Sequence, residues 1–203
     1  MRSTAGISVT AAEGNEFPRK KRRGIPKPVS ENSTVQMLEA CHRDSQAPIL
    51  VLGVGNSLLS DDGAGLVLLD ELSQDGGERG GEVEFLDGGT QGLALLGRIA
   101  RRAALLILDA VQLGAEPGTV HVVRDWRTTV ARAATAHESN VSELLATSGL
   151  MGECPETVVI VGIEPSCTTT GTGLSRPVRS AMAGAIETAR DVLAEMTAAP
   201  WAA

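Results

Sequence analysis

The chain has 203 residues, of which 42% are hydrophobic and 21% charged, which is enough apolar material for one domain with a real core. Aromatic residues make up only 2%, which argues against a binder of single-stranded nucleic acid, because such proteins stack bases on aromatic rings. The formal charge of −7 is uneven: residues 1–46 carry +3, residues 47–203 carry −10, and all three lysines lie in the first part. Residues 47–203 therefore contain neither a Walker-type phosphate lysine nor a Schiff-base lysine.

The first 46 residues differ from the rest in composition. They contain the basic run RKKRR at 19–23, three prolines and no sustained hydrophobic periodicity. Such a segment buries too little apolar surface to offset its chain entropy, so we expect a disordered basic N-terminal extension over 1–46 and a folded domain over 47–203.

The three cysteines have no CxxC spacing, and no apolar run approaches a membrane span or a secretory signal. We expect a soluble, cytoplasmic protein.

Strands and helices alternate from residue 49 onward. Unbroken apolar runs at 49–55, 103–110 and 157–163 are typical of buried parallel strands, and residues 82–86 form a further strand. The connection before a strand at 119–124 is too short for a helical crossover, so that strand is expected to be antiparallel to the preceding one and at an edge. Helices are predicted over 62–73, 91–102, 139–150 and from Ser175 to about 197. The predicted fold class is α/β, a three-layer α/β/α sandwich around a mostly parallel sheet of about five strands with one antiparallel edge strand.

Helical spacing also predicts which side chains face the core. The inward residues of the first two helices are Leu66, Leu69 and Leu72, and then Leu93, Leu96 and Ile99. Ser60 and Asp61 are good N-cap residues for the first of these helices, and Ser175 for the last.

Acidic residues follow the strands at the edge where α/β sheets bind ligands. Asp62 and Asp87 come after the first two strands, Asp109 closes the third, and Glu164 follows the last parallel strand. The pair Gly53 and Gly55 does not complete a dinucleotide fingerprint, since residue 58 is a leucine and the aspartates that follow would repel a pyrophosphate. No GxSxG or HExxH motif is present, which argues against serine hydrolase and zinc peptidase chemistry.

Histidine supplies one more candidate ligand. His121 alternates with two valines in the edge strand and is expected to point to solvent, whereas His137 lies in a loop before a helix. Asp62, Asp87 and His137 form a set with open positions that suits a divalent first-row metal such as nickel. The structural alternative is that Asp61 or Asp62 caps a helix and Asp87 fixes a turn, and Asp61 is the better placed of the two for a cap.

Several motifs resemble those of the [NiFe]-hydrogenase maturation proteases. They are LGVGNSLLSDDGAG at 52–65, LDGGTQGL at 86–93, LDA at 108–110, EPG at 116–118, TAH at 135–137 and VGIEP at 161–165. Their order and spacing extend the resemblance over residues 49–195. The resemblance implies an endopeptidase that removes a short C-terminal extension from the hydrogenase large-subunit precursor after nickel insertion.

The resemblance also implies site residues. Asp62, which stands where some members have glutamate, would contact the nickel bound in the precursor together with Asp87 and His137, while Asp109 would have a structural or peptide-positioning role. Members are classed as aspartic-type peptidases. Two mechanisms stay open: a metal held by the three residues polarises the scissile carbonyl and acidifies a water, or one aspartate acts as general base and nickel is chiefly a recognition mark.

Two other functions also stay open. One is a non-catalytic chaperone that reads the metal site of the precursor, and the other is a nucleotide-binding α/β domain. For the protease we expect a monomer whose partner is the large-subunit precursor, with no nucleic-acid or membrane partner.

Overall fold

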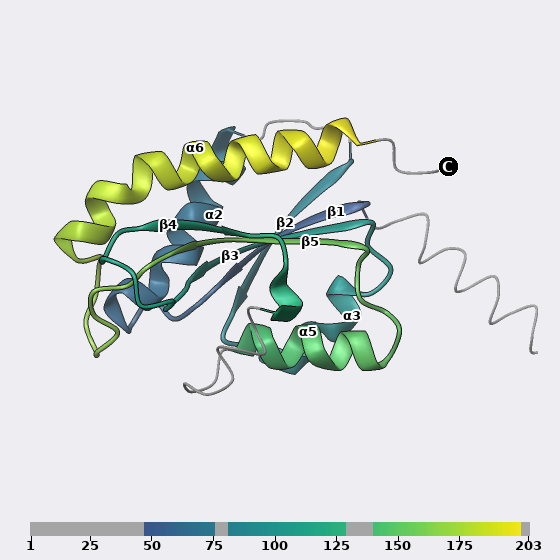
Figure 1. The fold of residues 1–203 in the computed structure, drawn as a ribbon, viewed down its shortest axis with the longest axis horizontal. Coiled ribbons are helices and arrows are strands. Elements are labelled where there is room, and N and C mark those ends of the chain that lie inside the picture. The colour runs from purple at the N-terminus through teal and green to yellow at the C-terminus, as the bar shows by residue number, and fades with distance from the viewer. Residues whose placement is uncertain (1–46, 76–80, 129–139, 200–203) are drawn as a thin grey trace, which may run out of the picture. The chain divides into compact units, whose positions relative to one another are not determined.

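The computed structural model of the protein describes residues 47–75, 81–128 and 140–199. Within these residues, strands and helices alternate along the chain in the order predicted from the sequence (Figure 1). The predicted N-terminal extension, residues 1–46, and His137 lie outside the described residues.

The strands form one sheet of mostly parallel strands. They are β1 (Ile49–Val54), β2 (Val83–Gly89), β3 (Ala104–Ala110), β4 (Val120–Val123) and β5 (Thr157–Ile163), in the order β2-β1-β3-β5-β4. All neighbours are parallel except β4, which pairs antiparallel with β5 at the edge of the sheet. Every residue of β1 is buried, as its unbroken apolar run predicts for a central strand covered on both faces. The predicted fold class is confirmed.

Helices cover both faces of this sheet (Figure 1). On one face lie α2 (Ala64–Asp75) and α6 (Arg176–Ala198); on the other lie the 3₁₀ turn η2 (Gly92–Leu95), α3 (Leu96–Ile99) and α5 (Asn140–Leu150). Successive side chains of β1 enter two separate cores, because side chains alternate across a strand. Ile49 and Val51 pack with the helices α2 and α6, and Leu50 and Leu52 pack on the side of α5.

The long helix α6 is amphipathic. It buries residues three or four positions apart, among them Val178, Met182, Ala185 and Ala189, and leaves its other face to solvent. Across the described ranges 47–75, 81–128 and 140–199, no helix combines the length and the apolar character that crossing a membrane requires.

The start of α2 lies directly against the sheet at Gly65. A Cβ atom at this position would lie 2.2 Å from the carbonyl oxygen of Leu108 and 2.4 Å from that of Val54, so no larger residue fits. The helix start is therefore fixed against the ends of β1 and β3. The 3₁₀ turn η1 (Ser60–Gly63), which precedes α2, is held at the carboxyl edge of the sheet as a result.

The predicted helix over 91–102 is shorter and wound differently from the expectation. It consists of η2 and α3 and ends at Ile99. Because 3₁₀ winding has three residues per turn, the inward face shifts: Leu95 is buried, whereas Leu93, predicted to face the core, is 40% exposed. In α2, Leu66, also predicted to face the core, is half-buried, and Leu68 lies fully in the core.

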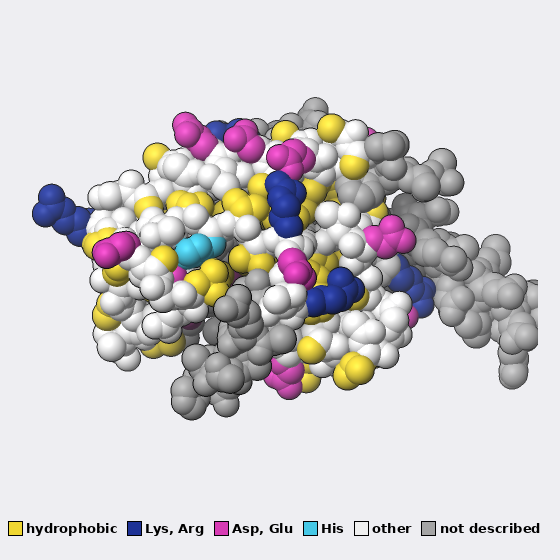
Figure 2. All heavy atoms as spheres, in the orientation of Figure 1, with side chains coloured by type: hydrophobic (Ala, Val, Ile, Leu, Met, Phe, Trp, Pro, Cys, Tyr) yellow, Lys and Arg dark blue, Asp and Glu magenta, His cyan; other side chains and the backbone are white. Residues whose placement is uncertain are grey.

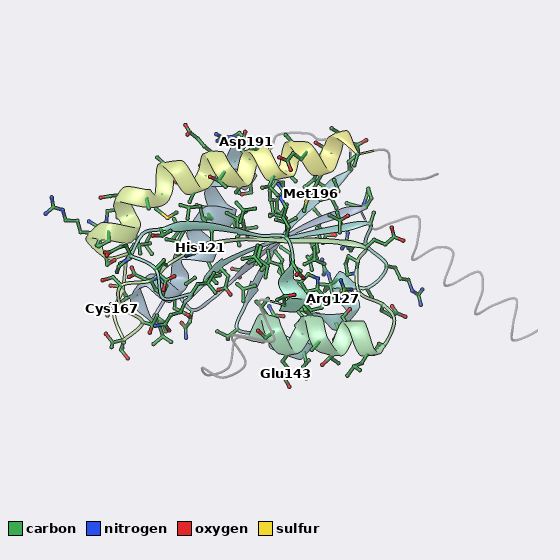
Figure 3. The ribbon with its side chains drawn as sticks, in the orientation of Figure 1. His121, Arg127, Glu143, Cys167, Asp191 and Met196 are labelled. Atoms are coloured by element: carbon green, nitrogen blue, oxygen red, sulfur yellow. The ribbon has the colours of Figure 1, made fainter. Side chains whose placement is uncertain are left out.

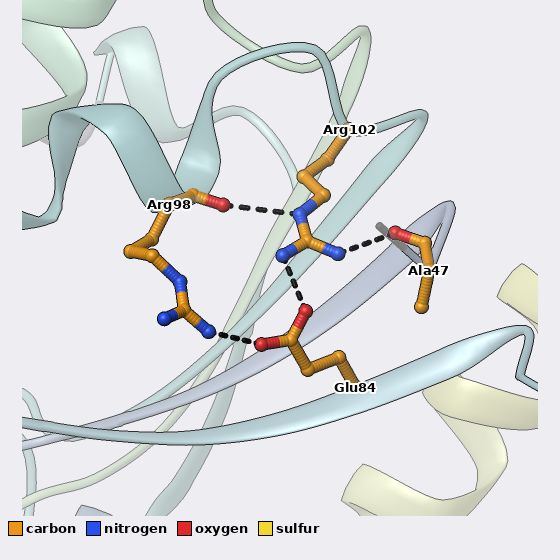
Figure 4. Close-up of polar contacts among 4 residues, drawn as sticks. All are labelled: Ala47, Glu84, Arg98 and Arg102. Atoms are coloured by element: carbon orange, nitrogen blue, oxygen red, sulfur yellow. Dashed lines mark hydrogen bonds and ion pairs between the residues drawn. The ribbon is translucent and has the colours of Figure 1, made fainter. Parts of the chain in front are cut away.

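A cluster of charged side chains closes the amino end of the sheet (Figure 4). The buried guanidinium of Arg102 donates to the carboxylate of Glu84 on β2, to the carbonyl oxygen of Ala47, and through Nε to the carbonyl oxygen of Arg98 at 3.0 Å. The guanidinium of Arg98 also contacts Glu84. These bonds fasten the segment before β1 to β2 and α3, so the cluster has a structural role at the end of the sheet opposite the acidic residues.

Candidate functional site

The carboxyl ends of the parallel strands meet at one edge of the sheet, and acidic residues gather there. Asp62 follows β1, Asp87 lies at the end of β2, Asp109 lies at the end of β3, and Glu164 follows β5 directly. Because β2, β1 and β3 are neighbours in that order, the expectation that Asp62 and Asp87 follow neighbouring strands at the same edge is confirmed.

Asp62 is held by the backbone of the loop that leads out of β1. The N–H of Asn56 donates to its Oδ2 atom at 2.7 Å, and the residue is half-buried. Gly55 has a φ of +126°, and a Cβ atom at this position would lie 1.9 Å from the carbonyl oxygen of Asp62, so glycine is required. The loop therefore folds back tightly on Asp62 and fixes its position at the sheet edge.

Asp61, predicted to be a helix cap, has a different role. Its carboxylate is fully buried and accepts hydrogen bonds from the backbone N–H groups of Ser175 (2.6 Å), Ser166 (2.9 Å) and Cys167 (3.0 Å). Burial opposes ionisation, but these bonds, led by that of Ser175, hold the pKa of Asp61 below its usual range. The prediction was wrong because the side chain turns away from its own helix and binds the loop between β5 and α6. Ser175 itself occupies the N-cap position of α6, as predicted, but its side chain makes no capping hydrogen bond.

Asp87 is exposed and lies next to a bulge in β2. It pairs with Gly53 of β1, while Gly89 pairs with Val54, so Gly88 is the extra residue of the bulge. A bulge bends its strand and redirects the neighbouring side chains, and bulges are common beside active sites. Within the part of the chain that the structure describes, no three His, Cys, Asp or Glu side chains are grouped closely enough to hold a metal ion. His137 lies outside that part, so the set of Asp62, Asp87 and His137 stays a prediction.

Asp109 is the acidic residue whose surroundings differ most from those of an ordinary surface carboxylate. Its exposed fraction is 8%, and its Oδ1 atom accepts a hydrogen bond from the N–H of Ala110 at 2.8 Å. Burial raises the pKa of Asp109 to about 7, against the effect of the Ala110 bond, and the negative charge of Asp62 raises it further. The burial of Asp109 was not predicted, although a lone aspartate at the end of the apolar run ALLILDA signals a buried carboxyl group.

His121, predicted to point to solvent, reaches the surface with only a small part of its side chain. Its side chain is 16% exposed, and its Nε2 atom lies 3.0 Å from Oε2 of Glu164, whose side chain is 4% exposed. The imidazole lies at the surface among hydrophobic side chains (Figure 2), at the same end of the sheet as Cys167 (Figure 3). Alternation along the strand predicted a free outer face, but the residue that follows β5 covers this position of β4.

Sequence comparison identifies the family. A family model described as hydrogenase maturation protease matches residues 67–192. The chain is 37% identical over 151 residues to the hydrogenase expression/formation protein HupD of Bradyrhizobium diazoefficiens, covering 72% of this chain and 78% of that protein. The chain belongs to the hydrogenase maturation protease family.

Further relatives of known name and structure agree with this family. The hydrogenase 2 maturation protease of Escherichia coli is 35% identical over 147 residues, which cover 68% of this chain and 86% of that protein. The structure of the hydrogenase maturating endopeptidase HybD from E. coli superposes with a TM-score of 0.63 at 34% identity, covering 73% of this chain and 93% of that one. The resemblance inferred from the motifs is confirmed, and the protein is a hydrolase of the endopeptidase class.

The range matched by the family model contains three of the four residues considered for the site. Asp87, Asp109 and His137 lie inside residues 67–192, and Asp62 precedes them in the loop after β1. Within the described chain, Asp62 and Asp109 lie at the carboxyl edge of the sheet, and Asp109 is the buried one, with its pKa raised by burial.

Proposed function

We propose that this maturation protease removes the C-terminal extension of a [NiFe]-hydrogenase large-subunit precursor after nickel has been inserted. The proposal is supported by family membership and by relatives whose names place them in hydrogenase maturation. We expect the enzyme to act as a monomer in the cytoplasm, with the precursor as its partner and nickel carried by that substrate.

The observation that carries a catalytic role is the burial of Asp109 at the sheet edge, where its carboxyl group accepts a hydrogen bond from the N–H of Ala110. Burial raises its pKa to about 7, so the group can take up and release a proton near neutral pH. In the proposed reaction Asp109 takes a proton from a water molecule whose oxygen attacks the scissile carbonyl carbon. The protonated carboxyl group then gives this proton to the leaving amine as the C–N bond breaks. Such an enzyme is an aspartic-type peptidase.

Three residues are predicted to contact the nickel of the substrate, and two of them, Asp62 and Asp87, lie at this edge. Asp62, Asp87 and His137 are the predicted contacts, and carboxylate and imidazole groups suit a divalent first-row metal. Nickel held in the precursor would supply positive charge beside the scissile bond. A set of three protein groups leaves coordination positions open, so Asp62, Asp87 and His137 could contact a metal that the partner's own ligands still hold. Cleavage would then depend on prior nickel insertion.

The test is incubation of the enzyme with nickel-loaded and nickel-free precursor, with mass spectrometry to detect loss of the C-terminal peptide. We expect cleavage of the nickel-loaded precursor only. Replacement of one group by its uncharged analogue (Asp62→Asn, Asp87→Asn, Asp109→Asn or His137→Gln) should slow cleavage by about 100-fold or more. Asp191→Asn, which changes an exposed carboxylate on α6, is the matched control and should cleave at the normal rate.

Each result bears on a separate part of the proposal. Normal cleavage by both Asp62→Asn and Asp109→Asn would remove the carboxyl pair from the mechanism. Cleavage of nickel-free precursor at the same rate would overturn the dependence on nickel. Stable binding of the nickel-loaded precursor without any mass loss would replace the protease by the non-catalytic chaperone.

A further inference from the structure

Glu164 is a buried carboxylate that takes no part in the chemistry described above. It is 3% exposed, and its carboxylate contacts residues of one loop and one strand. Its Oε2 atom accepts the N–H of Leu113 at 2.9 Å and lies 3.0 Å from Nε2 of His121, and its Oε1 atom accepts the N–H of Gly114 at 3.0 Å. Because an ionised carboxylate only accepts hydrogen bonds, the imidazole donates in this contact.

These bonds hold the loop that connects β3 to β4. The loop begins two residues after Asp109, and Glu164 also binds it through its own backbone: the N–H of Gly118 donates to the carbonyl oxygen of Glu164 at 2.8 Å, and the N–H of Glu164 donates to Thr119 at 2.9 Å. Gly114 has a φ of +82°, which allows the tight turn in the middle. Glu164 thus holds the middle and the end of the loop that follows Asp109 and Ala110.

The loop presents Leu113 to solvent. Its exposed fraction is 44%, although its backbone is fixed by Glu164. Leu58, in the loop after β1, is 62% exposed, and that loop is also fixed, since the Leu58 carbonyl oxygen accepts the N–H of Gly171 at 3.0 Å. Leu93, 40% exposed, follows β2. An exposed leucine on a rigid loop costs no backbone ordering entropy when a partner covers it, which favours binding.

The three leucines follow three neighbouring strands. In the order β2, β1, β3 the sheet edge carries Asp87, Asp62 and Asp109, and the loops after the same strands carry Leu93, Leu58 and Leu113 in the same order. We call these leucines the apolar rim. The loops that carry the rim therefore leave the sheet at the same edge as the acidic residues. A ligand that fits both has a positively charged centre flanked by aliphatic side chains.

We propose that the apolar rim binds the aliphatic side chains of the extended substrate segment on either side of the scissile bond, with Leu113 as a specificity-determining contact and Glu164 and His121 as its positioning residues. This inference rests on the proposed function, because it places the scissile bond at the acidic edge. Such contacts form in the ground state and in the transition state alike, so they act on KM rather than on kcat.

The first experiment compares leucine variants in cleavage of the nickel-loaded precursor. We expect Leu113→Ala to raise KM by about tenfold with kcat unchanged, and Leu58→Ala and Leu93→Ala to raise it less. The control is Leu150→Ala, because Leu150 is 90% exposed and ends α5 near the start of β5, at the opposite edge of the sheet. An unchanged KM for Leu113→Ala, or an equal rise in KM for Leu150→Ala, would overturn the proposal that the apolar rim binds the substrate.

The second experiment separates positioning from a merely structural role. Glu164→Gln puts an amide donor against groups that also donate, so the loop should shift and KM should rise by about tenfold. A structural role alone would lower the fraction of folded enzyme, and with it the apparent kcat, while KM stayed the same. In the double variant, loss of Leu113 should add little to the rise caused by Glu164→Gln, because the leucine is already displaced. Fully multiplicative effects would show that the two residues act separately and would overturn the positioning role.

Both experiments measure KM and kcat, so they require an enzyme that still cleaves the precursor. If the wild-type enzyme does not cleave, or if Asp62→Asn and Asp109→Asn both cleave normally, the proposed function or its site has failed. If the wild-type enzyme cleaves, those two variants are inactive and Leu113→Ala has a normal KM, only the rim has failed.

Discussion

The two ends of the sheet bury charge in opposite ways. At the amino end, the guanidinium of Arg102 is matched by the carboxylate of Glu84 and by two backbone carbonyl oxygens. At the carboxyl end, Asp61, Asp109 and Glu164 are all buried acids, and among the described residues no buried lysine or arginine lies with them. Balanced charge is what a structural cluster needs. Acids gathered at one end without a buried cation are typical of sites that bind or react.

The three buried acids at the carboxyl end also differ from one another. Asp61 accepts three backbone N–H groups, and Glu164 accepts two together with the imidazole of His121. In both, these bonds outweigh burial and lower the pKa. Within the described chain Asp109 accepts only the N–H of Ala110, and its pKa rises to about 7. The acid with the fewest partners is therefore the one suited to proton transfer, while the other two position loops.

The largest expected effect is that of Asp109→Asn, which should lower cleavage by about 100-fold or more and at the same time stabilise the fold. A carboxyl group whose pKa is 3.8 when unfolded and about 7 when folded opposes folding at neutral pH by about 4 kcal/mol. The asparagine removes this cost and keeps an oxygen that can accept the N–H of Ala110. Thermal unfolding and precursor cleavage measured on the same samples check both parts.

The sign of the pH dependence follows from the raised pKa. Below about pH 4 the group is protonated in both states, so the wild-type protein carries no penalty there. As the pH rises toward 7 and above, the penalty grows to its full size. The gain in melting temperature for Asp109→Asn should therefore be large at pH 8 and small at pH 5. An equal gain at the two pH values would mean that the side chain does not titrate in this range.

Asp61→Ala should have the next largest effect, a loss of about 3 kcal/mol in the free energy of unfolding, because three backbone donors lose a charged acceptor. A lost helix cap would cost only about 1 kcal/mol. The lowered pKa means that Asp61 stabilises the fold above its unfolded value of 3.8, and that this contribution disappears as the pH falls through the folded pKa. Urea unfolding at pH 7 and pH 3 should show the difference between wild type and variant shrinking in acid.

Arg102→Met tests the amino end and should cost about 2 kcal/mol, since Glu84 is part-exposed and water can replace the lost partner. The folded fraction should keep its normal kcat and KM, because no group at the carboxyl end is touched. Urea unfolding gives the stability, and precursor cleavage below the unfolding transition gives the kinetics. A tenfold loss of kcat in the folded enzyme would contradict the division of the sheet into a structural end and a reactive end.

Much of this comparison could be predicted from the sequence. The three unbroken apolar runs are typical of strands buried on both faces, and the position of an acid after each strand places the acids at one edge. The partners of single side chains could not be predicted. Asp61 has the residue type and position of a cap, yet its hydrogen-bond donors come from residues more than a hundred positions away. The contact between His121 and Glu164 likewise depends on how β4 and β5 pair.

The smallest effect is expected for the cysteines, which are predicted not to be nucleophiles. The Sγ atom of Cys167 lies 3.0 Å from the hydroxyl oxygen of Thr169, which lowers the pKa of this exposed thiol, whereas burial raises the pKa of Cys154. A thiolate nucleophile also needs a group that carries the proton to the leaving amine. In the described chain, the imidazole of His121 is bound to Glu164 and no hydrogen bond joins it to either thiol.

The double variant Cys154→Ala, Cys167→Ala should therefore cleave the precursor within about threefold of the normal rate, and iodoacetamide should leave the wild-type enzyme active. Loss of cleavage in a double variant with normal thermal unfolding would place a thiol in the mechanism and would contradict the central role of Asp109.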